Sequence, residues 1–220
     1  MGIYTMGQLA RFDEDLLYRA FGVDAELLID HAYGIEPVTI ADIKQYAPKS
    51  TSVTSGQVLM RDYTKAEGRT IVREMVEQLC LDLVRRNQVT ESVTIHVGFA
   101  KSTGLPSVNA TAKIGAPSCV DSVIIPEVLA VYDRVIRHDA MVRRFNISCN
   151  NLMDDDGNVQ LSLFDMDQGA SRQRDKQIQS TINDIKAKFG KNAMFKAYDL
   201  QEEATTIERN RQIGGHKSGE

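Results

Sequence analysis

Hydrophobic and polar residues alternate along four stretches in the middle of the chain, at residues 50–60, 92–101, 108–114 and 141–152. Alternation with a period of two is typical of a strand that has one buried face and one solvated face. These stretches therefore predict four strands, with Gly56 marking a bulge or bend in the first. The side chains expected to point inward are Val93, Ile95, Val97, Phe99, Phe145, Ile147 and Cys149.

Two segments between these strands have apolar residues at helical spacing instead. Residues 65–87 carry a stripe at i, i+3, i+4 and i+7, and residues 121–139 carry a second one. Pro126 falls in the first turns of the second helix, where proline is tolerated. The predicted stripes are Val72, Met75, Val76, Leu79 and Leu83 in the first helix, and Val128, Leu129, Tyr132, Val135 and Ile136 in the second.

The order strand, helix, strand, strand, helix, strand predicts an α+β fold of the ferredoxin-like βαββαβ type. In that fold both helices cover one face of an antiparallel sheet and leave the other face open. The open face is predicted to be polar and mildly basic. Its expected residues are Thr94, His96, Asn109, Thr111, Lys113, Arg144, Asn146 and Ser148.

The two ends of the chain have sequence patterns that differ from this block. Residues 1–45 predict short helices that begin near Thr5, at Asp13 or Asp15, and at Asp24, followed by a linker over residues 35–48. After residue 153, residues 160–164 lie between an acidic turn and a polar run. A helix is expected at 171–189 and a short extended piece at 193–197. The polar tail from Glu202 is expected to be mobile unless it docks. The expected divisions are therefore 1–45, 46–153, 154–169 and 170–220.

The segment Gln160-Leu161-Ser162-Leu163-Phe164 holds three large apolar side chains between solvated flanks. Such a segment is typical of a peptide offered to the groove of a partner protein. It is equally typical of an edge strand or of a loop that anchors itself on its own protein. The segment alone does not decide between these interpretations.

Composition narrows the class of protein. With 220 residues, 42% hydrophobic, and no apolar run of the roughly 20 residues that a membrane span needs, we expect a globular cytoplasmic protein without membrane contact. The cysteines Cys80, Cys119 and Cys149 predict reduced core thiols, with neither disulfide nor zinc. The net charge of −4 is uneven: residues 49–152 carry 13 basic and 10 acidic side chains, whereas residues 1–48 carry 3 and 8. A positive middle block permits a polyanionic partner.

No catalytic or metal-binding pattern stands out. Asp154, Asp155 and Asp156 resemble the start of a calcium loop, but an EF-hand needs Gly at its sixth position and Glu at its twelfth, where Val159 and Asp165 stand. The four histidines are scattered, and no phosphate-cradling glycine loop is present. The sequence predicts no catalytic residue and no metal ligand.

Phosphate contacts are the remaining candidate chemistry. The first strand opens with a cation and small hydroxyls, and further cations lie on or near the open face, which suits contacts to a DNA backbone. An ordinary solvated strand face would look similar. The candidate DNA-binding residues are Lys49, Ser50, Thr51, Ser52, Lys101, Lys113, Arg143 and Arg144.

Several segments together resemble the C-terminal part of a Y-family translesion DNA polymerase of the UmuC-like bacterial group. Residues 2–10 resemble half of that family's helix-hairpin-helix thumb, and residues 21–35 its closing helix. Residues 49–52 are similar to the opening of its little-finger domain, residues 160–164 to the bacterial sliding-clamp motif, and residues 204–216 to the tail of this group. The resemblance covers nearly the whole chain.

This resemblance implies that the βαββαβ block grips duplex or primer–template DNA and that Gln160, Leu161, Leu163 and Phe164 bind the sliding clamp. The family's palm and fingers, with the carboxylates that hold Mg²⁺ for nucleotidyl transfer, have no counterpart in this sequence. We therefore expect a truncated product or a piece of a polymerase, without cofactor and without catalysis of its own. Two alternatives stay open at this point: a ferredoxin-like interaction or small-molecule sensor module without nucleic-acid function, and a clamp-associated accessory protein.

Overall fold

The computed structural model describes residues 1–46, 51–156 and 166–212, apart from the side chains of residues 166–170. It divides the chain into two compact units, residues 1–49 and residues 50–220. The C-terminal helix and tail belong to the same compact unit as the sheet. The four functional divisions predicted from sequence stay predictions.

The first unit holds four short helices, α1 (Met6–Ala10), α2 (Glu14–Phe21), α3 (Asp24–Ala32) and α4 (Ile40–Gln45). Thr5 and Asp13 cap α1 and α2 as predicted, because each side-chain oxygen accepts a hydrogen bond from a backbone N–H of the first turn. α4 contradicts the expected linker over residues 35–48. Thr39 caps it through a reciprocal bond with Asp42, a signal already present in the sequence.

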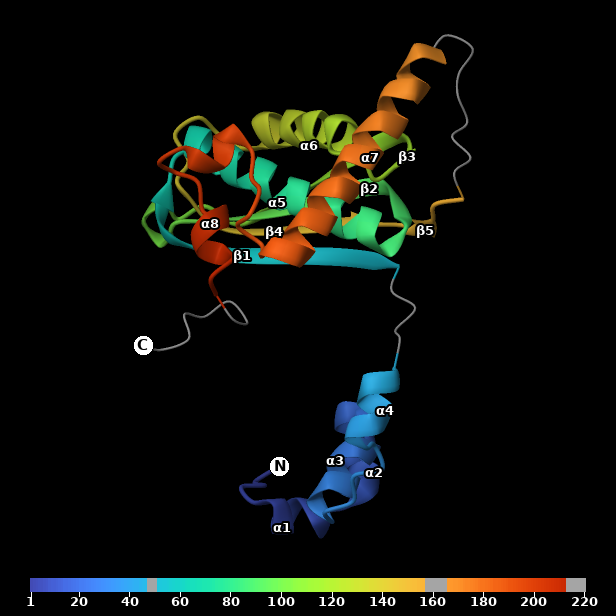
Figure 1. The fold of residues 1–220 in the computed structure, drawn as a ribbon. Coiled ribbons are helices and arrows are strands. Elements are labelled where there is room, and N and C mark those ends of the chain that lie inside the picture. Colours follow the sequence, from blue (N-terminus) through green and yellow to red (C-terminus); the bar gives the residue numbers. More distant parts are fainter. Residues whose placement is uncertain (47–50, 157–165, 213–220) are drawn as a thin grey trace. The chain divides into compact units, whose positions relative to one another are not determined.

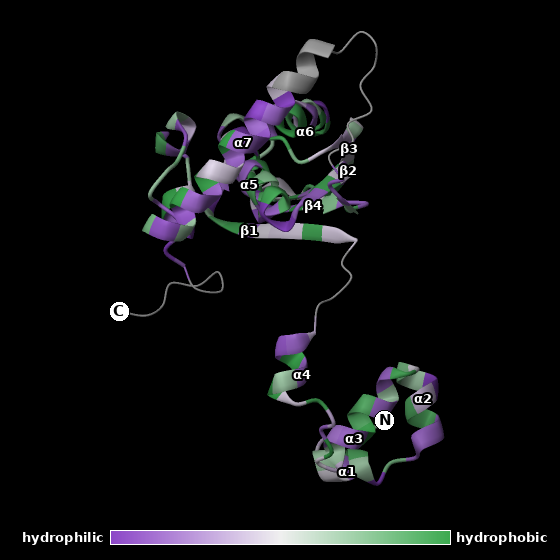
Figure 2. Cartoon of the chain, turned by 45° about the vertical axis from the view of Figure 1, so that its right-hand side comes forward, coloured by the Kyte–Doolittle hydropathy of each residue, from purple (hydrophilic) through white to green (hydrophobic). Residues whose placement is uncertain are grey.

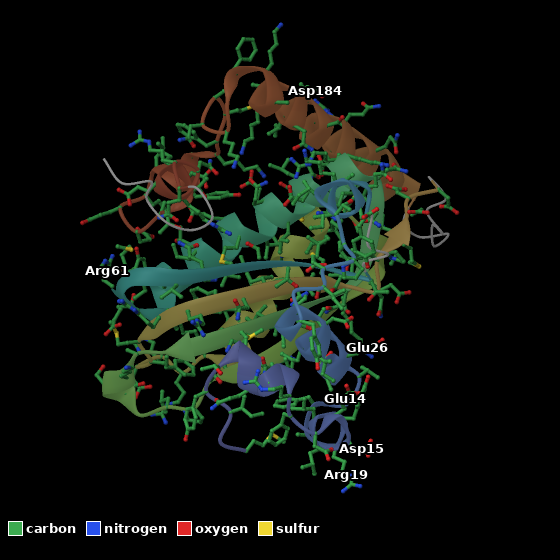
Figure 3. All side chains as sticks on the ribbon, turned by 90° about the horizontal axis from the view of Figure 1, so that it is seen from below. Glu14, Asp15, Arg19, Glu26, Arg61 and Asp184 are labelled. Carbon is green, nitrogen blue, oxygen red and sulfur yellow. The ribbon has the colours of Figure 1, made fainter. Side chains whose placement is uncertain are left out.

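Few side chains of the first unit are buried. Leu17 of α2 and Ala25 of α3 are fully buried, and the Tyr33 hydroxyl donates to the carbonyl of Ala10 at 2.6 Å. The charged side chains of α2 and α3 point away from this small core, as Figure 3 shows for Glu14, Asp15, Arg19 and Glu26. The unit is therefore held by a small apolar contact and by its caps.

The second unit confirms the predicted α+β fold and its βαββαβ order. The elements are β1 (Ser52–Tyr63), α5 (Lys65–Arg86), β2 (Gln88–Phe99), β3 (Val108–Ser118), α6 (Asp121–Val135) and β4 (Val142–Asn150). The sheet order is β1-β4-β2-β3, and every neighbouring pair is antiparallel. A short strand, β5 (Met153–Asp154), pairs with the start of β2.

Helices α5 and α6 lie together on one face of this sheet (Figure 1). The core lies between them and the strands, and both predicted helical stripes contribute to it. Val93, Ile95 and Val97 of β2 are fully buried, whereas Phe99 is only partly buried at the end of the strand. The three cysteines lie in this core as predicted and are free thiols. Burial raises the pKa of Cys119 to about 11, which keeps this thiol protonated near neutral pH.

The third long helix, α7 (Met166–Phe189), begins before the predicted residue 171 and is not the separate element that the sequence suggested. It packs on the helix layer, where Asn183 donates to the carbonyl of Leu81 at 2.9 Å. The sequence has apolar residues at helical spacing on this helix, Ile178, Ile182, Ile185 and Phe189, and the expectation that they form one buried stripe is wrong in part. Ile182 is buried, but Ile178 and Phe189 are 49% and 67% exposed. Much of α7 is hydrophilic in Figure 2, and Asp184 points outward from it in Figure 3.

The chain then continues through a short 3-10 helix, η2 (Ala197–Leu200), to the helix α8 (Thr206–Arg209). Residues 193–197 do not form the extended piece that was expected. The polar tail was expected to be mobile unless it docks. Residues 196–210 do dock on the second unit, beside α5 and β1 (Figure 1).

Candidate nucleic-acid interface

The open face of the sheet carries four rungs of aligned residues, which we call the polar grid. Strands β1, β4, β2 and β3 are in register across it, so each rung runs straight over the sheet. The rungs are Ser52–Asn150–Ser92–Lys113, Thr54–Ser148–Thr94–Thr111, Gly56–Asn146–His96–Asn109, and Val58–Arg144–Gly98. Every residue predicted for the open face lies in this grid.

Hydrogen bonds between neighbouring strands fix the small side chains of the grid. The hydroxyls of Thr54 and Ser148 lie 2.7 Å apart, and those of Thr94 and Thr111 lie 2.9 Å apart. His96 Nδ1 lies 2.7 Å from Asn109 Oδ1. These cross-strand bonds hold the polar groups low on the sheet, which leaves a flat surface of hydroxyls and amides.

Two glycines make room for neighbouring side chains of the grid. A Cβ at Gly56 would lie 2.5 Å from Asn146 Oδ1, and a Cβ at Gly98 would lie 3.3 Å from Arg144 Cβ. Gly56 was expected to mark a bulge or bend. In the structure it lies in a regular register, and its function there is to admit Asn146.

The charge on the grid is positive only. Lys113 and Arg144 are exposed, and neither makes an ion pair with another described residue. No grid position carries a carboxylate. A flat polar surface with cations and without anions suits phosphate oxygens, which accept hydrogen bonds from hydroxyls, amides and guanidinium groups.

The other predicted phosphate contacts have different surroundings. Lys101 is exposed in a 3-10 turn, η1 (Lys101–Thr103), beyond the end of β2. Arg143 lies where the register of β4 against β1 shifts, and its Nη1 is 3.6 Å from Asp62 Oδ1. Thr51 is exposed and Ser52 is partly exposed at the start of β1. Lys49 and Ser50 lie outside the described residues.

The candidate clamp-binding residues Gln160, Leu161, Leu163 and Phe164 also lie outside the described residues. The chain just before them is anchored on the second unit. Asp155 Oδ2 lies 2.5 Å from Lys176 Nζ of α7, and the backbone N–H of Asp155 donates to the carbonyl of Asn87 at 2.9 Å. The structure thus anchors the chain up to Asp155, and clamp binding by residues 160–164 stays a prediction.

The docked tail is a set of contacts that the sequence analysis missed. Glu74 of α5 is 4% exposed and accepts hydrogen bonds from the backbone N–H groups of Thr205 and Thr206 at 3.0 and 3.1 Å. Burial raises its pKa, and these bonds only partly offset that effect. Gln57 of β1 donates to the hydroxyl of Thr205 at 2.9 Å, so the tail bridges α5 and β1.

A second polar cluster holds the chain just before α8. Lys196 pairs with Asp121 and lies 3.7 Å from Glu77, and the Tyr198 hydroxyl donates to Glu77. Glu77 and Asp121 are 7% and 8% exposed. The sequence signal that could have revealed these contacts is the carboxylates on the buried side of α5, because a buried charge needs a partner from elsewhere in the chain.

Fold and surface together define an α+β domain of the little-finger type that Y-family DNA polymerases carry in their C-terminal region. The chain belongs to the impB/mucB/samB family, whose C-terminal domain matches residues 50–163. It is the C-terminal region of a UmuC-like protein of that DNA repair family.

Named relatives agree with this assignment. The chain is 29% identical over 223 residues to UvrX of Bacillus subtilis, a protein named for UV-damage repair, with 99% of this chain and 51% of that protein covered. It is 27% identical over 216 residues to DNA polymerase IV 2 of Halalkalibacterium halodurans, with 98% and 51% covered. It is 35% identical over 106 residues to the DNA repair protein homolog YobH of B. subtilis, with 46% of each covered. The chain spans about half the length of these relatives.

No described helix is long and apolar enough to cross a membrane. Among the described residues, no three His, Cys, Asp or Glu side chains are grouped so that they could hold a metal ion.

Proposed function

We propose that residues 49–152 bind duplex or primer–template DNA through its phosphates, with the polar grid as the contact surface. The observation that carries this proposal is the grid itself, four aligned rungs that hold hydroxyls and amides in three rungs, the cations Lys113 and Arg144, and no carboxylate. An interaction or sensor module would have no need to exclude acidic groups from a whole sheet face. The membership in a DNA repair polymerase family supports the same choice.

Recognition of this kind is independent of base sequence. The grid side chains are short and held by cross-strand bonds, so they contact phosphates and sugars and do not reach far into a groove. The described strands present no stacked aromatic residues on the open face, which disfavours base-specific single-strand binding. Within a whole polymerase, the domain would hold the duplex while nucleotidyl transfer with Mg²⁺ takes place in other domains.

The DNA proposal is tested with fluorescence anisotropy on two duplexes of unrelated sequence at low salt. The variant with Lys113→Gln and Arg144→Gln should lose affinity equally on both duplexes. The matched control carries Arg134→Gln on α6 and Lys188→Gln on α7, which remove the same charge from exposed positions of the helix layer. If both variants lose the same affinity, the grid is not the contact surface.

We propose further that Gln160, Leu161, Leu163 and Phe164 bind the sliding clamp and recruit the polymerase to a stalled fork. The support is the sequence pattern: Leu161, Leu163 and Phe164 lie between polar flanks, with Gln160 able to donate and accept at the rim of a pocket. Burial of Leu163 and Phe164 should contribute roughly 1.5–3 kcal/mol each.

The clamp proposal is tested with the full chain and purified clamp. Replacing both Leu163 and Phe164 with alanine should weaken binding by about two to four orders of magnitude. The matched control replaces Ile178 and Phe189 with alanine, because both are exposed apolar residues on α7. Equal affinity of the wild type and the first variant would show that the clamp does not bind this segment.

A further inference from the structure

A groove with a volume of about 780 Å³ runs between the polar grid and the docked tail. One side of it is formed by Gly56 and Val58 of β1 and by Arg144 and Asn146 of β4, and the other side by Glu208 and Arg209 of α8. β1 is the edge strand of the sheet, so the groove lies where the DNA-facing surface ends. The tail thus extends that surface around the sheet edge.

Arg209 is the distinctive residue of this groove. Its Nη2 donates to the Ser55 hydroxyl at 2.6 Å, and no described carboxylate lies within ion-pair distance of it. It is partly buried, and burial lowers its pKa from the usual value although the guanidinium stays charged. A partly buried guanidinium that has one hydroxyl partner among the described residues, for its five N–H donors, has further donors for an anion.

The groove concentrates positive charge. Arg144 enters from the grid and Arg209 from the tail, and Glu208 contributes the opposing carboxylate among the lining residues. Gly56 and the Asn146 side chain that it admits also line this groove. Two guanidiniums facing one groove match a phosphodiester, whose oxygens accept bidentate hydrogen bonds from arginine.

We propose that this groove binds a phosphate of the DNA backbone, with Arg209 of the tail joining Arg144 of the sheet. The inference rests on the proposed DNA-binding function and adds to it a contact outside the family's matched domain, which ends at residue 163. The docked tail is then part of the DNA interface. Its hydrogen bonds to Glu74 and Ser55 place Arg209 where a backbone leaves the edge strand.

The experiment measures duplex affinity against salt concentration for Arg209→Gln in the full chain. One lost phosphate contact should flatten the slope of log affinity against log salt by about 0.9 and lower affinity about eightfold at 0.1 M salt. Arg211→Gln is the matched control, because Arg211 is exposed, carries the same charge two residues away and does not line the groove. It should change the slope by much less. Glu208→Gln should raise affinity, a gain that loss of tail structure would not produce.

Two more variants separate contact from positioning. Arg209→Lys keeps the charge and should retain most of the slope. Ser55→Ala removes the anchor of Arg209 without removing charge, so it should lower affinity and flatten the slope less than Arg209→Gln does.

The outcomes distinguish the two proposals. If Arg209→Gln behaves as Arg211→Gln while the grid variant still loses affinity, this inference is wrong and the grid proposal stands. An equal loss in Ser55→Ala and Arg209→Gln would also overturn it, because the tail would then act only by its position. A third outcome also overturns the inference: inorganic phosphate stabilises the wild type but not Arg209→Gln, while neither the phosphate nor the substitution changes DNA binding. The groove would then bind a free anion. If the wild type has no salt-dependent affinity, the grid proposal fails first.

Discussion

Replacing Glu74 with alanine should release the C-terminal tail from α5 while leaving the sheet intact. Both oxygens of this carboxylate accept hydrogen bonds from the tail, from the backbone N–H groups of Thr205 and Thr206 and from the Thr205 hydroxyl at 3.2 Å. Alanine removes all of these acceptors at once. Without these acceptors, the backbone N–H groups of Thr205 and Thr206 can be satisfied only by water, so this part of the tail should open, although Glu77 and Thr70 of α5 keep their contacts with residues 196–203.

The size of the effect follows from these bonds. A hydrogen bond to a charged group contributes about 1.5–3 kcal/mol, and the raised pKa of Glu74 shows that burial disfavours its charge, so the low end of that range applies. Two to three such bonds give about 3–4.5 kcal/mol for tail opening, which is about 160- to 2000-fold in the opening equilibrium.

Hydrogen exchange measures this opening directly. The amides of Thr205 and Thr206 should exchange faster by that factor in Glu74→Ala, whereas amides of β2 and β4 should keep their protection. Glu202→Ala is the matched control, since Glu202 is exposed and its replacement removes the same charge. If Glu74→Ala leaves the exchange of the tail amides unchanged, Glu74 does not hold the tail. A uniform loss of protection across the sheet would contradict the separation of tail and core.

Two further changes test the core and the cap of α5. Gly68→Ala should destabilise the second unit by about 1–2 kcal/mol in urea unfolding, because the new Cβ would lie 2.6 Å from Tyr132 Oη and 2.8 Å from Val142 Cγ2, and overpacking outweighs the gain in helix propensity. Gly115→Ala, with no atom within 4 Å of the new Cβ, should change stability by less than about 0.5 kcal/mol, and equal effects would refute the packing argument. For Glu67, the hydrogen bond from Arg61 lowers the pKa to about 2, so its stabilisation is present above pH 4.5 and is lost as the pH falls toward 2. The stability difference between wild type and Glu67→Gln should therefore shrink over that interval, and a constant difference would show that the pair does not titrate as described.

The sheet could be predicted from sequence because its signal is local. Alternation within one strand already separates the buried Val93, Ile95 and Val97 from the outward Thr94 and His96. The rungs could not be predicted, since they depend on the register between strands distant in sequence. Arg143 illustrates the limit: alternation already assigns Arg144 and not Arg143 to the open face, but only the register shows that Arg143 lies where β1 and β4 shift, with its Nη1 3.6 Å from Asp62 Oδ1.

The tail could not be predicted for the same physical reason. Glu74 and Thr205 are 131 residues apart, and nothing in a helical pattern shows which distant backbone will satisfy a buried carboxylate. The apolar residues at helical spacing on α7 did not predict its buried face, because that face includes the polar residue Gln179. Gln179 is 2% exposed and donates to the carbonyl of Cys119. The helix α4 could have been predicted, because its capping pair Thr39 and Asp42 can be recognised in the sequence.

The salt dependence of DNA binding tests the central claim most directly. The full chain should bind two unrelated duplexes alike, with log affinity falling against log salt at a slope of roughly −3, as expected for three or four neutralised phosphates. Removing Lys113 and Arg144 together should flatten that slope by about 1.8 on both duplexes. A wild-type slope near zero, or a slope that the double variant leaves unchanged, would contradict the assignment of the polar grid as a phosphate-binding surface.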